Sequence, residues 1–409
     1  MFWQTKKLGD KNYFEILGSG IDKFEGEKSY LSTSSIEKNI IKTPEGKITY
    51  QERPSRANMQ PRLNSVWFAR MKDTIKVYSF TKENKDEINK YILSTGFAGV
   101  LCNTNKVLPK YVEKIFLSKW FNGFKNALAS DKAIQKSLNN EDIINIKIPL
   151  PPLPEQQKIV YILDSIQDAI RTQEKIIEKT KELNKSMMAD LFKYGGPSFR
   201  KGRKLKKTEI GEIPENWEVV TIKNIGEVVT GTTPSTLVKD YWNGDIPFVT
   251  PTDITKKYVE NTERYISQKG LQKARLLPKD SILVTCIASI GKISITPKPC
   301  ISNQQINAII CKENIDNEYI YYVMNHMSDR LKMWAGQTTS PIVKKSLFEK
   351  FILPLPKDKN EQREIAEILQ TIDQKIEIEQ KKKALYEELF RTMLNKLMTG
   401  EIRVDNLKL

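Results

Sequence analysis

The chain has 409 residues, and its 66 lysines and arginines outnumber 50 aspartates and glutamates, which gives a formal net charge of +16 at pH 7. This charge favours a polyanion such as nucleic acid as the partner, with a basic surface that serves only solubility as the alternative. The single histidine, His326, excludes a histidine metal cluster and a repeated histidine-based triad. We therefore expect His326 to be structural, and we expect neither a metal site nor a catalytic residue.

We find no segment that would place the chain in a membrane. No apolar run reaches the roughly 18 residues that a spanning helix needs, and the first ten residues contain no signal-peptide core. The four cysteines have neither Cys-x-x-Cys spacing nor a histidine partner, which indicates reduced, mostly buried thiols. These observations predict a cytoplasmic protein.

The first block of the chain, residues 1–147, contains short β-branched and aromatic runs, such as 66–68 and 75–80, that predict a mixed, strand-rich domain. Near its start, Phe14 to Gly20 resembles the glycine turn that follows the first strand of many nucleotide or S-adenosylmethionine sites. Neither a phosphate-binding loop nor an Asn-Pro-Pro-aromatic or Asp-Pro-Pro-aromatic tetrapeptide accompanies it. The favoured interpretation is an ordinary turn before a strand.

Residues 148–195 begin as a proline-rich strand end and continue, after Glu155 and Gln156, without glycine or proline as far as Gly195. A heptad pattern of apolar residues predicts one long helix here. The linker that follows, residues 196–210, is basic. Its six clustered cations either contact DNA phosphates or are simply solvated: Arg200, Lys201, Arg203, Lys204, Lys206 and Lys207.

The second block, residues 211–351, again contains short strand-like runs, and a second helical segment, residues 352–409, follows it. The two helical segments repeat each other, because aligning Glu155-Gln156 with Glu361-Gln362 superimposes their apolar residues without a gap. The superimposed residues are Ile159, Ile162, Leu163, Ile166 and Ile170 on Ile365, Ile368, Leu369, Ile372 and Ile376. The order of block, helix, block, helix indicates duplication of the whole unit.

Such helices would each be about 58 Å long at about 1.5 Å per residue, too long for the interior of one domain, and we expect them to pair as an antiparallel coiled coil. Two unrelated helices packed on their own domains are the disfavoured alternative. Polar residues in the seam would fix its register: Gln173, Asn184, Glu379 and Lys383. The predicted fold class is α+β, with two mixed, strand-rich recognition domains separated by the helix pair in pseudo-two-fold symmetry.

These features resemble the specificity subunit of a type I restriction-modification system over essentially the whole chain. The two Pro-Leu-Pro to Glu-Gln segments and the stretch 211–219, Gly-Glu-Ile-Pro-Glu-Asn-Trp-Glu-Val, carry the resemblance. The second block adds Thr-Gly-Thr-Thr-Pro at 230–234, the stretch 241–249 and Ser-Asn-Gln-Gln at 302–305. The first block lacks equivalents of the Thr-Pro loop and of Trp-Asn-Gly-Asp-Ile-Pro, so its recognition residues cannot be inferred from those of the second.

The resemblance implies a non-catalytic subunit that recognises a bipartite double-stranded DNA target, with one half-site for each recognition domain. It also implies that the subunit holds two methyltransferase (modification) subunits and recruits ATP-dependent restriction subunits, which translocate DNA. We expect no cofactor on this chain and S-adenosylmethionine, ATP and Mg on the partners. Two alternatives are a non-specific coiled-coil DNA-binding scaffold and a specificity polypeptide fused to a DNA methyltransferase or nuclease.

Loop-like sequence in the second block supplies the candidate DNA contacts. Amides can make bidentate contacts to adenine and lysine can reach guanine, whereas capped turns or satisfied buried amides are the structural alternative. We predict DNA contacts for Thr232, Thr233, Lys292, Asn303, Gln304, Gln305 and Gln337, together with Arg200, Lys201, Arg203 and Lys204 of the linker.

Overall fold

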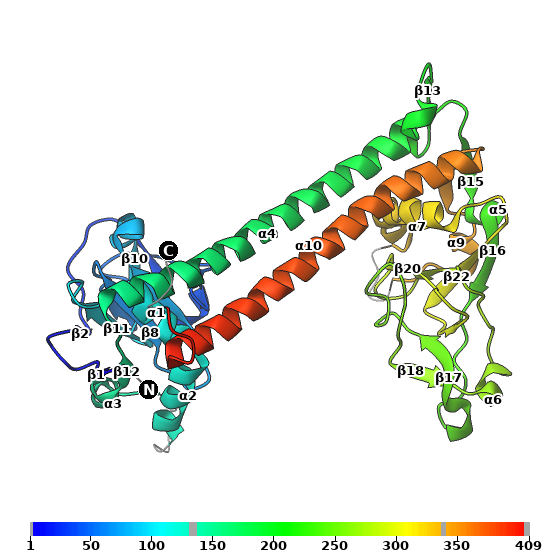
Figure 1. Cartoon of the computed structure of the whole chain (residues 1–409). Helices are drawn as coiled ribbons and strands as arrows, with labels where there is room; N and C mark the ends of the chain where they lie inside the picture. Colours follow the sequence, from blue (N-terminus) through cyan, green and yellow to red (C-terminus); the bar gives the residue numbers. More distant parts are fainter. Residues whose placement is uncertain (1–2, 131–136, 337–340, 405–409) are drawn as a thin grey trace. The chain divides into compact units, whose positions relative to one another are not determined.

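The computed structural model describes residues 3–130, 137–336 and 341–404, and the chain forms two compact units. Unit 1 comprises Met1–Glu174 and Lys381–Leu409, and unit 2 comprises Lys175–Gln380. Each unit contains one strand-rich block and part of each of two long helices, α4 (Leu153–Tyr194) and α10 (Lys359–Thr399) (Figure 1). The long uninterrupted helices predicted from the heptad pattern are therefore present.

Unit 1 is built around a central antiparallel sheet whose strand order is β2-β11-β8-β9. Its strands are β2 (Phe14–Leu17), β11 (Phe97–Cys102), β8 (Ser65–Ala69) and β9 (Val77–Phe80). A second sheet has the order β6-β3-β10-β7, from β6 (Gly46–Ile48), β3 (Lys28–Leu31), β10 (Tyr91–Ser94) and β7 (Ala57–Met59). In this second sheet β3 and β10 are parallel.

Helices cover the central sheet of unit 1 and lead into the coiled coil. Helix α1 (Pro109–Leu117) begins with a proline at its first position, where the missing N–H is not needed, and α2 (Lys119–Ser130) follows it. After α3 (Asn140–Asn145), strand β12 (Lys147–Pro149) pairs with β1 (Thr5–Lys7). The short pair β4 (Ile36–Glu37) and β5 (Ile40–Ile41) completes the unit's strands within the described residues.

Unit 2 repeats this plan. Its central sheet has the order β16-β22-β19-β20, from β16 (Gly226–Thr230), β22 (Ile306–Cys311), β19 (Ile282–Thr285) and β20 (Ile293–Ile295). Its second sheet, β18-β17-β21, is built from β18 (Arg264–Ile266), β17 (Trp242–Val249) and β21 (Ile301–Ser302). Strands β17 and β21 are parallel, as β3 and β10 are in unit 1.

Most of the remaining elements of unit 2 also have counterparts in unit 1. Helices α7 (Asn317–His326), α8 (Ser328–Trp334) and α9 (Lys345–Phe348) follow the last sheet strand, and β23 (Ile352–Leu355) pairs with β15 (Glu218–Thr221) before α10 begins. Two short helices, α5 (Ile222–Ile225) and α6 (Gln268–Leu271), are additional. The predicted α+β fold and the duplication are thus confirmed at the level of topology.

The long helices run antiparallel within each unit. In unit 1, Ile159 and Leu163 near the start of α4 share a buried core with Leu394 and Leu397 near the end of α10. In unit 2, the end of α4 and the start of α10 share another core, which includes Leu191, Phe192, Ile365 and Leu369. The predicted antiparallel pairing is therefore confirmed, and apolar burial is its main source of stability.

Polar residues interrupt this seam where the heptad pattern predicts them. Gln173, Asn184 and Glu379 are all buried. In unit 2 the Asn184 Nδ2 donates to Asp373 Oδ1 at 2.7 Å, and in unit 1 the Lys383 Nζ lies 2.8 Å from Glu174 Oε1. These contacts join α4 to α10, as expected of residues that fix a register.

Two further expectations concern the cysteines and the membrane. All four cysteines are free; Cys102, Cys286 and Cys300 are buried, and burial raises the pKa of the Cys286, Cys300 and Cys311 thiols to about 12. This agrees with reduced, unreactive thiols. Among the described residues, no helix combines the length and the apolar character that crossing a membrane requires.

Candidate nucleic-acid interface

The loop that follows β16 in unit 2 lies against the chain at the end of β21. The backbone N–H of Gly231 donates to Ile306 O at 3.1 Å, and that of Thr232 donates to Ser302 O at 2.8 Å. A Cβ at Gly231 would lie only 2.1 Å from Asn303 O, so this close approach requires glycine. The Thr-Gly-Thr-Thr-Pro and Ser-Asn-Gln-Gln sequences, about 70 residues apart in the chain, are therefore neighbours in the fold.

Side chains reinforce the same contact. The Asn303 Nδ2 donates to Gln305 Oε1 at 2.9 Å, the Gln305 N–H donates to Asn303 Oδ1 at 3.1 Å, and the Thr233 hydroxyl donates to Gln304 Oε1. Gln304 is exposed, whereas Thr233, Asn303 and Gln305 are half-buried. The amides thus stabilise the turn and also border the surface.

Lys292 lies beside this turn, immediately before β20. It is exposed, its Nζ donates to Pro251 O at 3.2 Å, and its carbonyl accepts from the Thr285 N–H at 3.0 Å. Cys286, which follows Thr285, donates its N–H to Gln305 O at 2.8 Å. These bonds connect one group of predicted residues, here termed the loop cluster: Thr232, Thr233, Lys292, Asn303, Gln304 and Gln305. Gln337 lies outside the described residues, and DNA contact stays a prediction for all of them.

The basic linker has more structure than its composition suggests. It contains a short helical turn at Pro197–Phe199 and β13 (Leu205–Thr208), which pairs with β14 (Gly211–Pro214). The Arg200 guanidinium pairs with Asp190 and donates to Gly195 O, and the Lys206 Nζ donates to Glu215 O at 2.8 Å. Lys201, Lys204 and Lys207 are exposed.

Arg203 is held in a buried ion pair. Both terminal nitrogens of its guanidinium donate to the carboxylate of Glu361, whose side chain is only 1% exposed, and the Gly196 N–H donates to the same carboxylate at 3.2 Å. A bidentate arginine and carboxylate are among the strongest charge-assisted contacts. Arg203 therefore connects the linker to the start of α10 in unit 2, a role that we did not predict.

Unit 1 contains the equivalent contact. Glu155, which aligns with Glu361, accepts from the Trp3 indole N–H at 3.1 Å and from the Arg403 Nε at 3.3 Å. Arg403 follows the end of α10, just as Arg203 follows the end of α4. In each unit the segment after one long helix thus contacts the first turn of the other, where the helix dipole favours a carboxylate.

The glutamine next to each of these glutamates is also buried. The Gln156 Nε2 donates to Lys106 O and Pro151 O, and its Oε1 accepts from the Leu108 N–H at 2.9 Å. The Gln362 Oε1 accepts from the Asp316 N–H at 2.8 Å, and its Nε2 donates to Pro356 O at 2.9 Å. Leu108 and Asp316 precede α1 and α7, so each glutamine ties a recognition block to a long helix.

This duplicated fold corresponds to a known family. Residues 3–182 and 214–388 match the type I restriction modification DNA specificity domain. The chain belongs to this family. Each matched range contains one strand-rich block and much of the long helix that follows it.

Individual specificity subunits are also similar. The MjaIX specificity subunit of Methanocaldococcus jannaschii is 39% identical over 198 residues, covering 47% of this chain and 46% of the relative. This chain thus spans about half the length of that relative. The putative MjaX specificity subunit of the same organism is 32% identical over 308 residues, which cover 74% of this chain and 70% of the relative. The predicted resemblance is confirmed.

Solved structures extend the comparison to the whole chain. A chain from a study of the assembly and conformational transition of the type I restriction-modification system has a TM-score of 0.67 at 18% identity, with 98% of both chains covered. The HsdS subunit from Thermoanaerobacter tengcongensis has a TM-score of 0.52 at 20% identity, covering 98% of this chain and 97% of that one. At these identities the likeness establishes the fold.

Proposed function

We propose that this chain is the sequence-specificity subunit of a type I restriction-modification complex, and that each strand-rich block reads one half of a bipartite DNA target. The observation that carries the proposal is the pair of specificity domains, each with its own sheets and each joined to the long helices by the same Glu-Gln contacts. Duplicated readers on one chain suit a target with two half-sites.

The chemistry of the loop cluster supports base reading in unit 2. Gln304 presents an exposed amide, which suits the N6 and N7 edge of adenine, and the exposed ammonium of Lys292 suits guanine O6 and N7. Lys201 and Lys204 are exposed on the linker and suit phosphates, which position the duplex without reading it. The net charge of +16 adds long-range attraction for DNA.

The partners follow from the same proposal. Two equivalent ends would each hold one methyltransferase subunit, and restriction subunits with translocase activity would join the complex in the cytoplasm. S-adenosylmethionine, ATP and Mg would act on those partners, while this chain contributes recognition and no catalytic group. A methyltransferase bound close to each reader would place the modified base inside the half-site that the reader selects.

Mapping methylated sites tests the proposal directly. The chain is produced with its methyltransferase partner in a host that lacks other modification, and methylated positions are located across the genome. We expect one bipartite motif with a fixed spacer, and Gln304→Ala should relax one half of it. Methylation without a sequence motif would instead indicate a non-specific scaffold.

Binding assays with the isolated chain address the remaining alternatives. Competition with random-sequence duplexes measures preference, and raising the salt concentration should weaken binding steeply because neutralised phosphates release counterions. Saturable binding of S-adenosylmethionine, or methyl transfer by the isolated chain, would instead identify a fused enzyme.

A further inference from the structure

We infer that unit 1 reads its half-site at the sheet corner formed by Ser19, Arg56, Lys76 and Thr95, and that Arg56 reads a guanine there. This inference rests on the proposed function and assigns recognition residues to the block that lacks the sequence motifs of unit 2. It follows from the hydrogen-bond register of the two central sheets, which superimposes unit 1 on the loop cluster of unit 2.

The first correspondence joins Lys76 to Lys292. In unit 1 the Ala69 N–H at the end of β8 donates to Lys76 O at 2.9 Å; in unit 2 the Thr285 N–H at the end of β19 donates to Lys292 O at 3.0 Å. Each lysine immediately precedes the next strand, β9 or β20. The two lysines therefore occupy the same place in the sheet.

Their ammonium groups confirm this match. The Lys76 Nζ donates to Thr33 O, and the Lys292 Nζ donates to Pro251 O. Thr33 is two residues beyond the end of β3, and Pro251 is two residues beyond the end of β17. Since β3 and β17 are the corresponding parallel strands, both lysines reach the same backbone position.

The second correspondence joins Thr95 to Gln304. The Arg70 N–H donates to Gly96 O at 2.9 Å, and the Cys286 N–H donates to Gln305 O at 2.8 Å. Parallel pairing agrees, because Leu93 is opposite the last residue of β3 and Ser302 is opposite the last residue of β17. Gly96 therefore matches Gln305, and Leu93 matches Ser302. Either match places Thr95 at the position of Gln304.

The third correspondence concerns the glycine turn after β2. In the antiparallel pairs, Leu17 is opposite Gly99, and Val229 is opposite Ala308. Gly99 and Ala308 are each three residues beyond the matched pair Gly96 and Gln305, so Leu17 corresponds to Val229. Ser19 then corresponds to Gly231, and the turn that resembles a nucleotide site lies where unit 2 has Thr-Gly-Thr-Thr-Pro.

Arg56 lies beside this corner. Its carbonyl accepts from the Thr95 N–H at 2.9 Å, and the Gly20 N–H donates to the nearby Asn58 O at 2.8 Å. The Arg56 side chain is exposed, and within the described part of the chain no hydrogen bond or ion pair engages its guanidinium. It is therefore available for an external ligand.

The other arginines of the block are already engaged. Arg53 lies over the Tyr50 ring, Arg62 pairs with Glu15, and Arg70 donates to Phe97 O at 3.0 Å. A guanidinium suits bidentate contact with guanine O6 and N7, whereas the exposed amide of Gln304 in unit 2 suits adenine. The two half-sites should thus differ in base composition at the positions read by these residues.

Methylation mapping with matched variants tests the inference in the full chain with its methyltransferase. Arg56→Ala should reduce discrimination at one guanine of one half-site by about tenfold to a hundredfold, and Gln304→Ala should relax the other half-site only. Arg56→Lys keeps the charge without the fork and should also relax that guanine. Arg62→Ala, before the start of β8 and so away from the corner at the other end of that strand, is the control and should leave the motif unchanged.

The outcomes separate the inference from the proposed function. A wild-type bipartite motif that Gln304→Ala changes and both Arg56 variants leave intact would overturn the reading corner while the specificity subunit stands. Absence of a bipartite motif from the wild-type complex would overturn both. Thermal unfolding of each variant is measured alongside, and because Arg56 is exposed its removal should leave the melting temperature unchanged.

Discussion

The two units share a topology but attach their recognition blocks to the long helices by different chemistry. Tyr111 in α1 and Tyr319 in α7 occupy the same place. Each donates its hydroxyl to the carbonyl of a proline, Pro149 or Pro354, in the strand that leads into the following long helix. One turn later the units diverge, because α1 has Lys114 where α7 has Tyr322.

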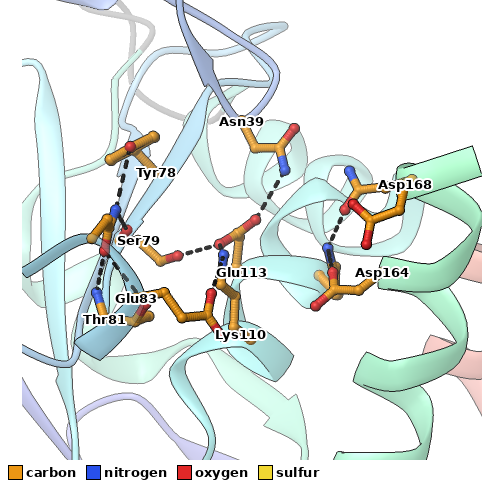
Figure 2. A network of polar contacts seen from close by, with 12 residues as sticks. Asn39, Tyr78, Ser79, Thr81, Glu83, Lys110, Glu113, Asp164 and Asp168 are labelled. Atoms are coloured by element: carbon orange, nitrogen blue, oxygen red, sulfur yellow. Dashed lines mark hydrogen bonds and ion pairs between the residues drawn. The ribbon is translucent and has the colours of Figure 1, made fainter. Parts of the chain in front are cut away.

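In unit 1 the attachment is ionic. The Lys114 side chain is 1% exposed, and its Nζ lies 2.5 Å from Asp164 Oδ1 of α4 and also donates to Gln167. Beside it the buried Glu113 accepts from Asn39 Nδ2 at 3.0 Å and from Ser79, with Lys110 at 3.5 Å (Figure 2). Buried charges are costly to leave unpaired, so this attachment depends on every member.

In unit 2 the attachment is carried by a neutral donor. The Tyr322 hydroxyl donates to Asp373 Oδ2 of α10 at 2.7 Å, and the Asn184 amide of α4 donates to Asp373 Oδ1 at the same distance. Backbone contacts thus preserve the fold through duplication, while side chains at equivalent positions can exchange an ion pair for hydrogen bonds. The difference predicts unequal sensitivity of the units to substitution and pH.

The largest expected effect compares the two helix-start glutamates. Glu361→Ala leaves the Arg203 guanidinium, 11% exposed, without its carboxylate, and should destabilise unit 2 by about 3–5 kcal/mol. Glu155→Ala should cost unit 1 about 2 kcal/mol, since the Arg403 side chain is 43% exposed and water can replace the contact. Hydrogen exchange resolved by peptide measures each unit separately.

The exposed Glu367 on α10 provides the matched control. Glu367→Ala should change stability by less than about 0.5 kcal/mol. Equal losses for Glu155→Ala and Glu361→Ala would show that exposure of the arginine does not determine the cost.

The next effect compares the attachments themselves. Lys114→Met removes the cation that faces both Asp164 and Glu113, and should destabilise unit 1 by about 3 kcal/mol. Tyr322→Phe removes one hydroxyl and leaves Asp373 its bond from Asn184, so unit 2 should lose about 1–2 kcal/mol. Urea unfolding monitored by hydrogen exchange gives both values, and a larger loss for Tyr322→Phe would contradict the ionic interpretation.

The acid limb of the stability profile should distinguish the units as well. Burial alone would raise the pKa of Glu113, but Lys110, Lys114 and hydrogen bonds from Ser79 and Asn39 hold it below its usual 4.5. Because the folded pKa is the lower one, ionised Glu113 contributes stability above about pH 4.5, and this contribution is lost as the pH falls through the folded value.

Glu113→Gln tests this linkage. The variant should be less stable than the wild type at pH 7 by about 1–2 kcal/mol, and the difference should narrow in acid. Glu37→Gln, at an exposed residue paired with Lys42, serves as the control and should change stability by less than about 1 kcal/mol at pH 7. A Glu113→Gln deficit that stays constant from pH 7 to pH 3 would contradict the cause assigned to the shift.

The sequence was sufficient for the features that depend on local periodicity. Uninterrupted heptads predicted α4 and α10, and the repeated Pro-Leu-Pro to Glu-Gln segments predicted the duplication. The helices begin a few residues later than the predicted segments, at Leu153 and Lys359, because the prolines before them belong to strands and turns. Pro154 lies in the first turn of α4, where its missing N–H is not needed. In unit 2 the loop cluster also lay in residues that the sequence singled out.

Other features depend on contacts that no local pattern encodes. From the sequence, Arg203 was predicted only as one of the cations of the basic linker. Its ion pair could not be predicted, because its partner, Glu361, is 158 residues away. The corner of unit 1 could not be predicted from the sequence. Residues 18–20, Gly-Ser-Gly, occupy the structural position of residues 230–232, Thr-Gly-Thr, but the two segments share no side-chain pattern. The backbone register of the strands, which no sequence pattern shows, was needed to match Lys76 and Thr95 with Lys292 and Gln304.

The smallest single effect is expected within the seam, at the contact between Lys383 and Glu174. The pair of Lys383 and Glu174 in unit 1 is 30% and 50% exposed, so Glu174→Gln should cost only about 0.2–1 kcal/mol, and the loss should vanish near 1 M salt. Asn184→Ala in unit 2 removes a buried donor from Asp373 and should cost about 1–3 kcal/mol at any salt concentration. Denaturation at low and high salt would distinguish the two variants. A loss of stability that disappears at high salt identifies a surface charge pair. A loss that persists at high salt identifies a desolvated hydrogen bond that holds the register of the helices.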